Sequence, residues 1–152
     1  GSDQCTVCFH VDDLMITCRD ESVVDKVIEK LIDRFKTITV HTGPVFSYLG
    51  MSLDFSVSSQ VKITMEKYIV DVIKDTGTTK AASSPARDNL FEIDGDSPKL
   101  DDENRESFHS NVARLLYLAK RVRPDILCAV SFLCTRVREP TEEDLEKLTR
   151  CL

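Results

Sequence analysis

The stretch 9-FHVDDLMITC-18 places two adjacent aspartates, Asp12 and Asp13, between two apolar segments. Residues 5–11 alternate between apolar and polar side chains, and residues 14–18 are again rich in strand-forming types, so both segments are predicted strands. Only the aspartate pair separates them. The sequence therefore predicts a short hairpin with both carboxylates at its connection.

Two carboxylates on a rigid hairpin suit metal-assisted phosphoryl transfer, because hard oxygen ligands can hold two Mg²⁺ ions about 4 Å apart. A third carboxylate is usually needed to fill both metals. Aspartate is also favoured in solvated turns, and a second adjacent pair, Asp101-Asp102, occurs in the chain. Spacing alone leaves both interpretations open.

The remainder of the first half predicts further elements. Ser22 is a candidate N-cap for a helix over 22–35, whose apolar residues recur at helical spacing and are expected in the core. Residues 45–55 and 61–65 are predicted strands that form a second hairpin through a polar turn. A helix over 66–76 is expected to end at Gly77.

The second half changes character. Residues 77–106 lack hydrophobic periodicity and are rich in turn-forming and acidic residues, which predicts a flexible linker. Helices are expected from residue 107, with Pro124 starting the second of them and Thr141, followed by Asp144, opening the last. The period changes from two to 3.6 along the chain. We therefore predict an α+β chain in three parts: 3–76, 77–106 and 107–152.

Composition limits the class of protein. The chain has 152 residues, of which 41% are hydrophobic, so it is long enough to bury a core. No apolar run approaches the roughly 18 residues that cross a bilayer, and no secretory leader is visible. We expect no membrane partner and an intracellular location in the cytoplasm or the nucleus. Gly1-Ser2 resembles a cloning remnant, so the chain is expected to be a fragment.

Charge is unevenly distributed. The net charge of −6 argues against a general nucleic-acid binder, but residues 88–106 are mainly acidic and residues 107–138 mainly basic. The six cysteines lie in apolar runs and are expected to be reduced and buried. A zinc site at Cys5 and Cys8 is not expected, because a strand directs residues three apart to opposite faces and no second ligand cluster follows.

Several motifs occur in one order: 11-VDDLMI-16, an amphipathic helix, 48-YLGMSLDF-55, 67-KYIVDVI-73, 115-LLYLAKRVRPDI-126 and 128-CAVSFL-133. Over nearly the whole chain, this order resembles the copia-type (Ty1/copia, Pseudoviridae) retrotransposon reverse transcriptases. The resemblance is to the later part of that polymerase domain. It implies a partial palm, with two β-hairpins packed on a helix, followed by a helical thumb-like and connecting portion.

The resemblance also implies roles for particular residues. Asp12 and Asp13 correspond to the catalytic, Mg²⁺-binding pair, with Asp12 as the direct ligand. The segment Leu49-Gly50-Met51 resembles the primer grip, which positions the 3′ end of the growing strand. The residues expected to meet the primer–template are His10, Arg114, Lys120, Arg121 and Arg123. For the four basic helix residues, a solvated helix face is the alternative.

Two departures from the family pattern matter. His10 stands where the family has a tyrosine two positions before the pair, and these residues hold neither the strand with the third catalytic aspartate nor the nucleotide-binding fingers. The resemblance thus implies a fragment of an RNA-directed DNA polymerase, whose partners are a primer–template and the upstream fingers and palm segment. The isolated fragment is expected to be inactive. The alternative is a co-opted, non-catalytic module that binds protein or nucleic acid.

Overall fold

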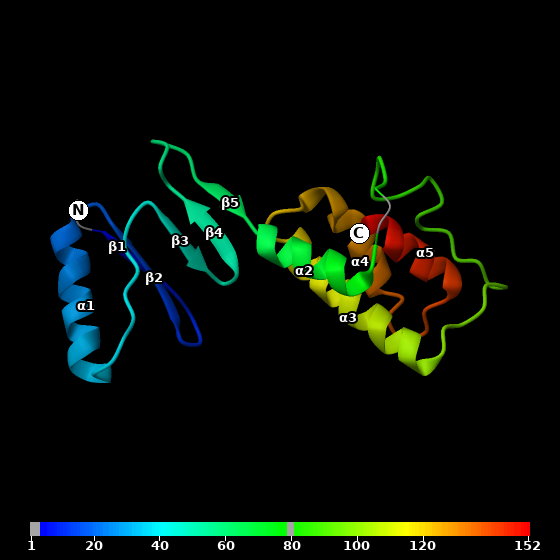
Figure 1. Ribbon diagram of the computed structural model, residues 1–152, viewed down its shortest axis with the longest axis horizontal. Coiled ribbons are helices and arrows are strands. Elements are labelled where there is room, and N and C mark those ends of the chain that lie inside the picture. The colour runs from blue at the N-terminus through cyan, green and yellow to red at the C-terminus, as the bar shows by residue number, and fades with distance from the viewer. Residues whose placement is uncertain (1–3, 79–80) are drawn as a thin grey trace. The chain divides into compact units, whose positions relative to one another are not determined.

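A computed structural model describes residues 4–78 and 81–152 (Figure 1). The described chain is α+β, as predicted, with two small antiparallel sheets and five α-helices. It divides into two compact units, the first ending at Lys62 and the second beginning at Ile63. The boundary differs from the predicted parts, because the helix over 66–76 belongs to the second unit rather than to the part with the hairpins. The predicted cloning remnant lies outside the described residues.

The first hairpin has the predicted strands. Strand β1 (Cys5–His10) pairs antiparallel with β2 (Asp13–Cys18), in a register that runs from Cys5 opposite Cys18 to His10 opposite Asp13. Val11 and Asp12 alone form the connection, so Asp13 is the first residue of a strand rather than part of the turn. The near-alternation of residues 5–11 and the strand-forming residues of 14–18 made this element predictable.

Helix α1 (Glu21–Phe35) packs against β2. Its N-cap is Asp20 rather than the predicted Ser22, because the Asp20 carboxylate accepts the backbone N–H of Ser22 at 3.0 Å. The residues of the predicted apolar stripe are half-buried or exposed, and no α1 residue is fully buried. The expectation that this stripe is core was therefore too strong.

The stretch predicted as one strand over 45–55 is itself a hairpin. Strands β3 (Val45–Tyr48) and β4 (Met51–Asp54) pair antiparallel around Leu49-Gly50, and β5 (Lys62–Thr64) completes the sheet order β3-β4-β5. The φ angles of Leu49 and Gly50 are 50° and 74°. Positive φ at both central residues is the requirement of a type I′ turn, for which Leu-Gly is a weaker sequence signal than Asn-Gly.

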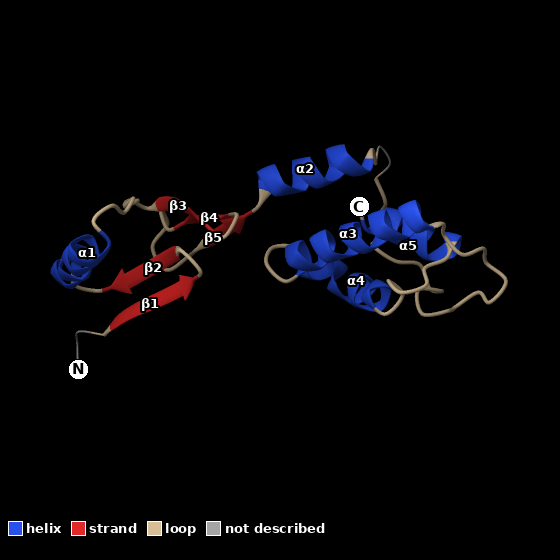
Figure 2. Cartoon of the chain, turned by 90° about the horizontal axis from the view of Figure 1, so that it is seen from below, coloured by secondary structure: helices blue, strands red, loops and turns tan. Residues whose placement is uncertain are grey.

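The second unit is a small helical bundle, shown in Figures 1 and 2. It contains helices α2 (Glu66–Thr76), α3 (Asp102–Ala119), α4 (Leu127–Cys134) and α5 (Glu142–Cys151), with a 3₁₀ turn, η1 (Pro124–Ile126), before α4. Helix α3 packs on α4 and α4 on α5. The buried side chains of this core include Val72, Phe108, Leu115, Ile126, Val130, Leu133 and Leu148. Burial of each large apolar side chain contributes about 1.5–3 kcal/mol.

The helix ends of the second unit follow the sequence in part. Gly77 closes α2 with a φ of 65°, as predicted, and Thr141 forms the predicted capping box with Asp144. Helix α3 begins at Asp102 instead of residue 107, because the Asp101 side chain accepts the backbone N–H of Asn104 at 2.8 Å. No helix in the described part of the chain is long and apolar enough to cross a bilayer.

The predicted linker carries packed contacts where it is described. Leu90 is buried, and the ring of Phe91 meets that of Phe132 edge-on at 5.6 Å. Backbone hydrogen bonds of 2.9 Å join Leu100 to Pro140 and Glu142 to Pro98. The predicted mobility of this segment stays a prediction, but isolated apolar residues without a period, such as Leu90 and Phe91, gave no sign of this packing.

The six cysteines all carry free thiols. Only Cys151 is buried, whereas Cys8 and Cys128 are exposed and the other three are intermediate. The prediction of buried thiols was therefore wrong for most of them. For β1 the reason is that a two-stranded sheet buries little of either face.

Candidate metal and nucleic-acid site

The acidic pair sits at the tip of the β1–β2 hairpin. Asp12 is the second residue of the two-residue turn, and Asp13 begins β2 opposite His10. His10, Asp12 and Asp13 are all exposed. The tip therefore presents both carboxylates, with one imidazole beside them, to solvent.

The turn itself has an unusual backbone. Val11 has a φ of 52°, in the left-handed region that β-branched residues rarely adopt, and the residue is 84% exposed. Such a residue costs of order 1–3 kcal/mol and is often found at functional sites. Here the positive φ closes the hairpin in two residues and so holds Asp12 and Asp13 at its apex.

The donor set at the tip fits part of a Mg²⁺ site. Mg²⁺ is usually bound through one or two carboxylates, with waters and substrate phosphates completing its shell. Within residues 4–78 and 81–152, no group of three or more His, Cys, Asp or Glu side chains is arranged to hold a metal ion. The two carboxylates therefore supply oxygen ligands of the right kind without forming a full protein cage.

The residues that resemble a primer grip are brought together in the β3–β4 turn. Leu49 and Gly50 are the turn residues, and Met51 opens β4 opposite Tyr48. Gly50 is exposed, whereas Leu49 and Met51 are half-buried. This hairpin tip presents backbone and apolar atoms rather than charge.

The predicted basic residues lie around the end of α3 in the second unit, and three of them have partners within the chain. Arg114 pairs with Asp75 at 2.8 Å. The Arg121 guanidinium lies 3.5 Å from the ring centroid of Tyr117 and donates to the carbonyl oxygen of that residue at 3.1 Å. Lys120 caps α3 and is exposed.

Arg123 and Asp125 form the tightest of these pairs. Nε and Nη2 of Arg123 donate to both carboxylate oxygens of Asp125 at 2.7–3.1 Å. Hydrogen bonding by Arg123 lowers the pKa of Asp125, and the same bonds raise the pKa of Arg123. A phosphate would have to compete with this carboxylate for Nε and Nη2 of Arg123.

Sequence reasoning missed the partners of these basic residues. Asp125 lies two residues from Arg123, so its proximity was visible in the sequence. Asp75 lies on α2 and reaches Arg114 only through the packing of α2 on α3, where the rings of Tyr68 and Tyr117 meet at 5.4 Å. No local sequence pattern predicts the ion pair between Asp75 and Arg114.

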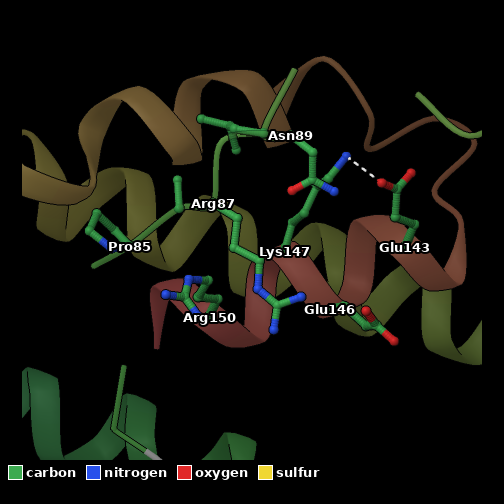
Figure 3. A pocket seen from close by; sticks show the side chains of 9 residues that line it. Pro85, Arg87, Asn89, Glu143, Glu146, Lys147 and Arg150 are labelled. Atoms are coloured by element: carbon green, nitrogen blue, oxygen red, sulfur yellow. Dashed lines mark ion pairs between the residues drawn. The ribbon is translucent and has the colours of Figure 1, made fainter. Parts of the chain in front are cut away.

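The second unit also holds a small cavity of about 90 Å³ between the 85–90 loop and α5 (Figure 3). Its lining includes Arg87 and Arg150, together with the ion pair of Lys147 with Glu143 at 3.0 Å. Small-molecule sites are usually about 300–1,000 Å³. The sequence did not single out this cavity, and its size does not fit a nucleotide.

The chain is similar in sequence to several known proteins, among them transposon polyproteins. It is 24% identical to the Transposon Ty1-NL2 Gag-Pol polyprotein of Saccharomyces cerevisiae, over 94% of this chain and 9% of the polyprotein. It is 30% identical to an uncharacterized mitochondrial protein of Arabidopsis thaliana, over 95% of this chain and 58% of that protein. A truncated Ty1-A Gag-Pol polyprotein of the yeast is 23% identical over 94% of the chain and 13% of its own length.

The chain thus spans under a tenth of the Ty1-NL2 polyprotein and 58% of the mitochondrial protein. No protein-family profile matches it, and no solved structure matches it significantly. These relatives confirm the resemblance to copia-type retrotransposon proteins that the ordered motifs indicated.

Proposed function

Because the chain is a homologue of the Ty1/copia Gag-Pol polyproteins, we propose that it is part of a retrotransposon reverse transcriptase, an RNA-directed DNA polymerase. The first unit is the end of the palm, and the helical bundle is the thumb-like and connecting portion. The observation that carries the proposal is the placement of Asp12 and Asp13 at the apex of a tight, strained hairpin turn.

The proposed chemistry is nucleotidyl transfer. Mg²⁺ ions, when bound, would stabilise the attacking and leaving oxygens of an in-line displacement. Asp12 supplies a carboxylate from the turn, and Asp13 supplies a second from the start of β2. Because Val11 closes the turn in two residues, Asp12 and Asp13 are held next to each other at the tip of the hairpin while the strands are paired.

The remaining proposed roles concern the primer and template. The Leu49-Gly50 turn contacts the 3′ end of the primer through backbone and apolar atoms. Lys120 meets a phosphate directly, whereas Arg114 and Arg123 do so by exchanging Asp75 and Asp125 for phosphate. Each neutralised phosphate then makes the slope of log affinity against log salt more negative by about 0.9 on a B-form duplex.

The test uses a longer protein that carries this chain together with upstream fingers and palm segments. Primer extension on an RNA template should depend on Mg²⁺ and be lost on Asp12→Ala, and the isolated chain should not extend a primer. Asp33→Ala is the matched control, since it removes one exposed carboxylate from α1 in the same unit. Extension that survives Asp12→Ala would contradict the proposal.

The exposed apolar side chains of the first hairpin favour a second candidate, a non-catalytic binding module. Phe9 is 77% exposed, and Val7 and Leu14 are exposed beside it. Surface of this kind marks interaction sites. The second function is the better supported if two results are obtained. The longer protein should still fail to extend a primer after His10→Tyr, and Phe9→Ser should weaken capture of a protein or nucleic-acid partner.

A further inference from the structure

The strand register places Cys5 directly opposite Cys18 at the open end of the first hairpin. A two-residue turn makes the pair that flanks it, His10 and Asp13, a hydrogen-bonded pair, and such pairs alternate with non-hydrogen-bonded pairs along an antiparallel ladder. Counting back from the turn, Cys5 and Cys18 form a non-hydrogen-bonded pair. Both side chains therefore project from the same face.

This position has the dimensions of a disulfide. The Cα atoms of a non-hydrogen-bonded pair are about 4.5 Å apart, within the range of about 4.4–6.8 Å that disulfides span. Partial burial, followed by the charge and hydrogen bonding of the Cys18 thiol, raises the pKa of Cys5. The Cys18 thiol is therefore near enough to influence the Cys5 thiol.

The third cysteine of the hairpin cannot compete for either partner. Cys8 lies three residues from Cys5 on the same strand, about 10 Å away at roughly 3.4 Å per residue. It projects to the opposite face and pairs with Met15. The C-x-x-C spacing in the sequence therefore points to the wrong pair.

We propose that Cys5 and Cys18 form a reversible cross-strand disulfide when the chain meets a small-molecule disulfide such as oxidised glutathione. One thiolate attacks a glutathione sulfur and releases one glutathione, and the second thiolate then attacks the mixed disulfide and releases the other. The two protein thiols lose two electrons and two protons, and two molecules of reduced glutathione form. The site follows from the register alone and is independent of the proposed polymerase function.

The consequence is mechanical. The bond would join β1 to β2 at the end of the hairpin remote from the turn with Asp12. Because a cross-link restricts mainly the unfolded chain, it should suppress opening of the hairpin. Backbone amides of β1 and β2 should then exchange with solvent at least about tenfold more slowly in the oxidised chain, and recover after reduction.

The experiment incubates the full chain with oxidised glutathione, blocks the remaining thiols with iodoacetamide and digests with trypsin. All three hairpin cysteines fall in the peptide that ends at Arg19. We expect this peptide to be lighter by two hydrogens and to carry one blocked thiol, at Cys8. Cys8→Ser should keep the cross-link, and Cys5→Ser should leave a mixed glutathione disulfide on Cys18.

Three results would overturn the inference. They are glutathione adducts on both Cys5 and Cys18, a bond from Cys8 to either of them, or a peptide with all three thiols blocked at an oxidant level that modifies the exposed Cys128. Circular dichroism of each variant is compared with that of the parent chain. A matching spectrum shows that the variant is folded, so its thiol pairing can be interpreted.

Discussion

His10 and Asp13 are direct partners across the first hairpin, so the acidic pair is divided between a turn residue, Asp12, and a strand residue. The residue that departs from the family pattern is therefore paired with one of the two carboxylates. In the longer polymerase, His10→Tyr should alter activity through this pairing. Primer-extension rates of that variant and of His41→Tyr, a substitution at an exposed histidine away from the hairpin, check the expectation.

Val11→Gly should stabilise the first unit by about 0.5–1 kcal/mol, because glycine adopts the left-handed conformation without the steric cost that valine bears. Urea unfolding followed by the exchange of β1 and β2 amides measures the change. Val7→Gly is the control, since it places glycine in a strand and should destabilise. Equal destabilisation by both substitutions would mean that the backbone at Val11 is not strained.

Leu49→Asn should separate stability from function at the second hairpin. Asparagine before Gly50 suits a type I′ turn and should raise the stability of the hairpin by a few tenths to about 1 kcal/mol. In the proposed longer polymerase the same change should reduce primer extension, because it removes the proposed apolar contact of Leu49 with the primer. A parallel rise in stability and activity would rule out the primer-grip role of Leu49.

Asp144→Ala should destabilise the second unit by about 1–3 kcal/mol, because it removes the carboxylate of the α5 capping box and leaves the half-buried Arg136 without its partner. Asp144 accepts from Arg136 Nε at 3.2 Å and from the backbone N–H of Thr141 at 3.0 Å, with its side chain 3% exposed. Denaturant unfolding followed by helical circular dichroism gives the value. Glu142→Ala, on the exposed side of the same turn, should change it by less than about 0.5 kcal/mol.

The Arg123–Asp125 pair should make the second unit sensitive to acid. Because the pKa of Asp125 is lowered in the folded chain from its ordinary value of 3.8, its stabilisation is complete above that value and is lost as the pH falls through the lower, folded value. Asp125→Asn should remove this part of the pH dependence. Unfolding curves of the parent chain and of Asp125→Asn should differ in their dependence on pH at and below 3.8. Curves with the same pH dependence would show that the Arg123–Asp125 pair does not contribute to acid sensitivity.

Cys151 should resist alkylation in the folded chain. Burial raises the pKa of its thiol to about 11, so almost no thiolate is present near neutral pH, whereas Cys128 is exposed. The raised pKa also means that its contribution to stability is present at neutral pH and is lost as the pH rises towards about 11. Mass mapping after brief iodoacetamide treatment, with and without denaturant, reports the order of reaction.

Local patterns predicted the elements whose determinants are local. The period of two before Asp12 and the capping box at Thr141 each lie within a few residues, and both were correct. The local pattern did not indicate the Leu49-Gly50 turn, because leucine is an uncommon residue at positive φ, and only the resemblance to a primer grip implied a hairpin there. The pair between Arg114 and Asp75 was missed because it depends on two helices meeting, which no window of sequence contains.

Helix α1 and strand β2 have a further consequence for the acidic turn. A two-stranded sheet alone is at best marginally stable in water. The packing of α1 on β2 therefore helps to keep the strands paired, and the placement of the two carboxylates depends on how often this packing opens locally. A substitution that frays α1 would act at Asp12 and Asp13 through the fraction of time the hairpin is closed, without touching either residue.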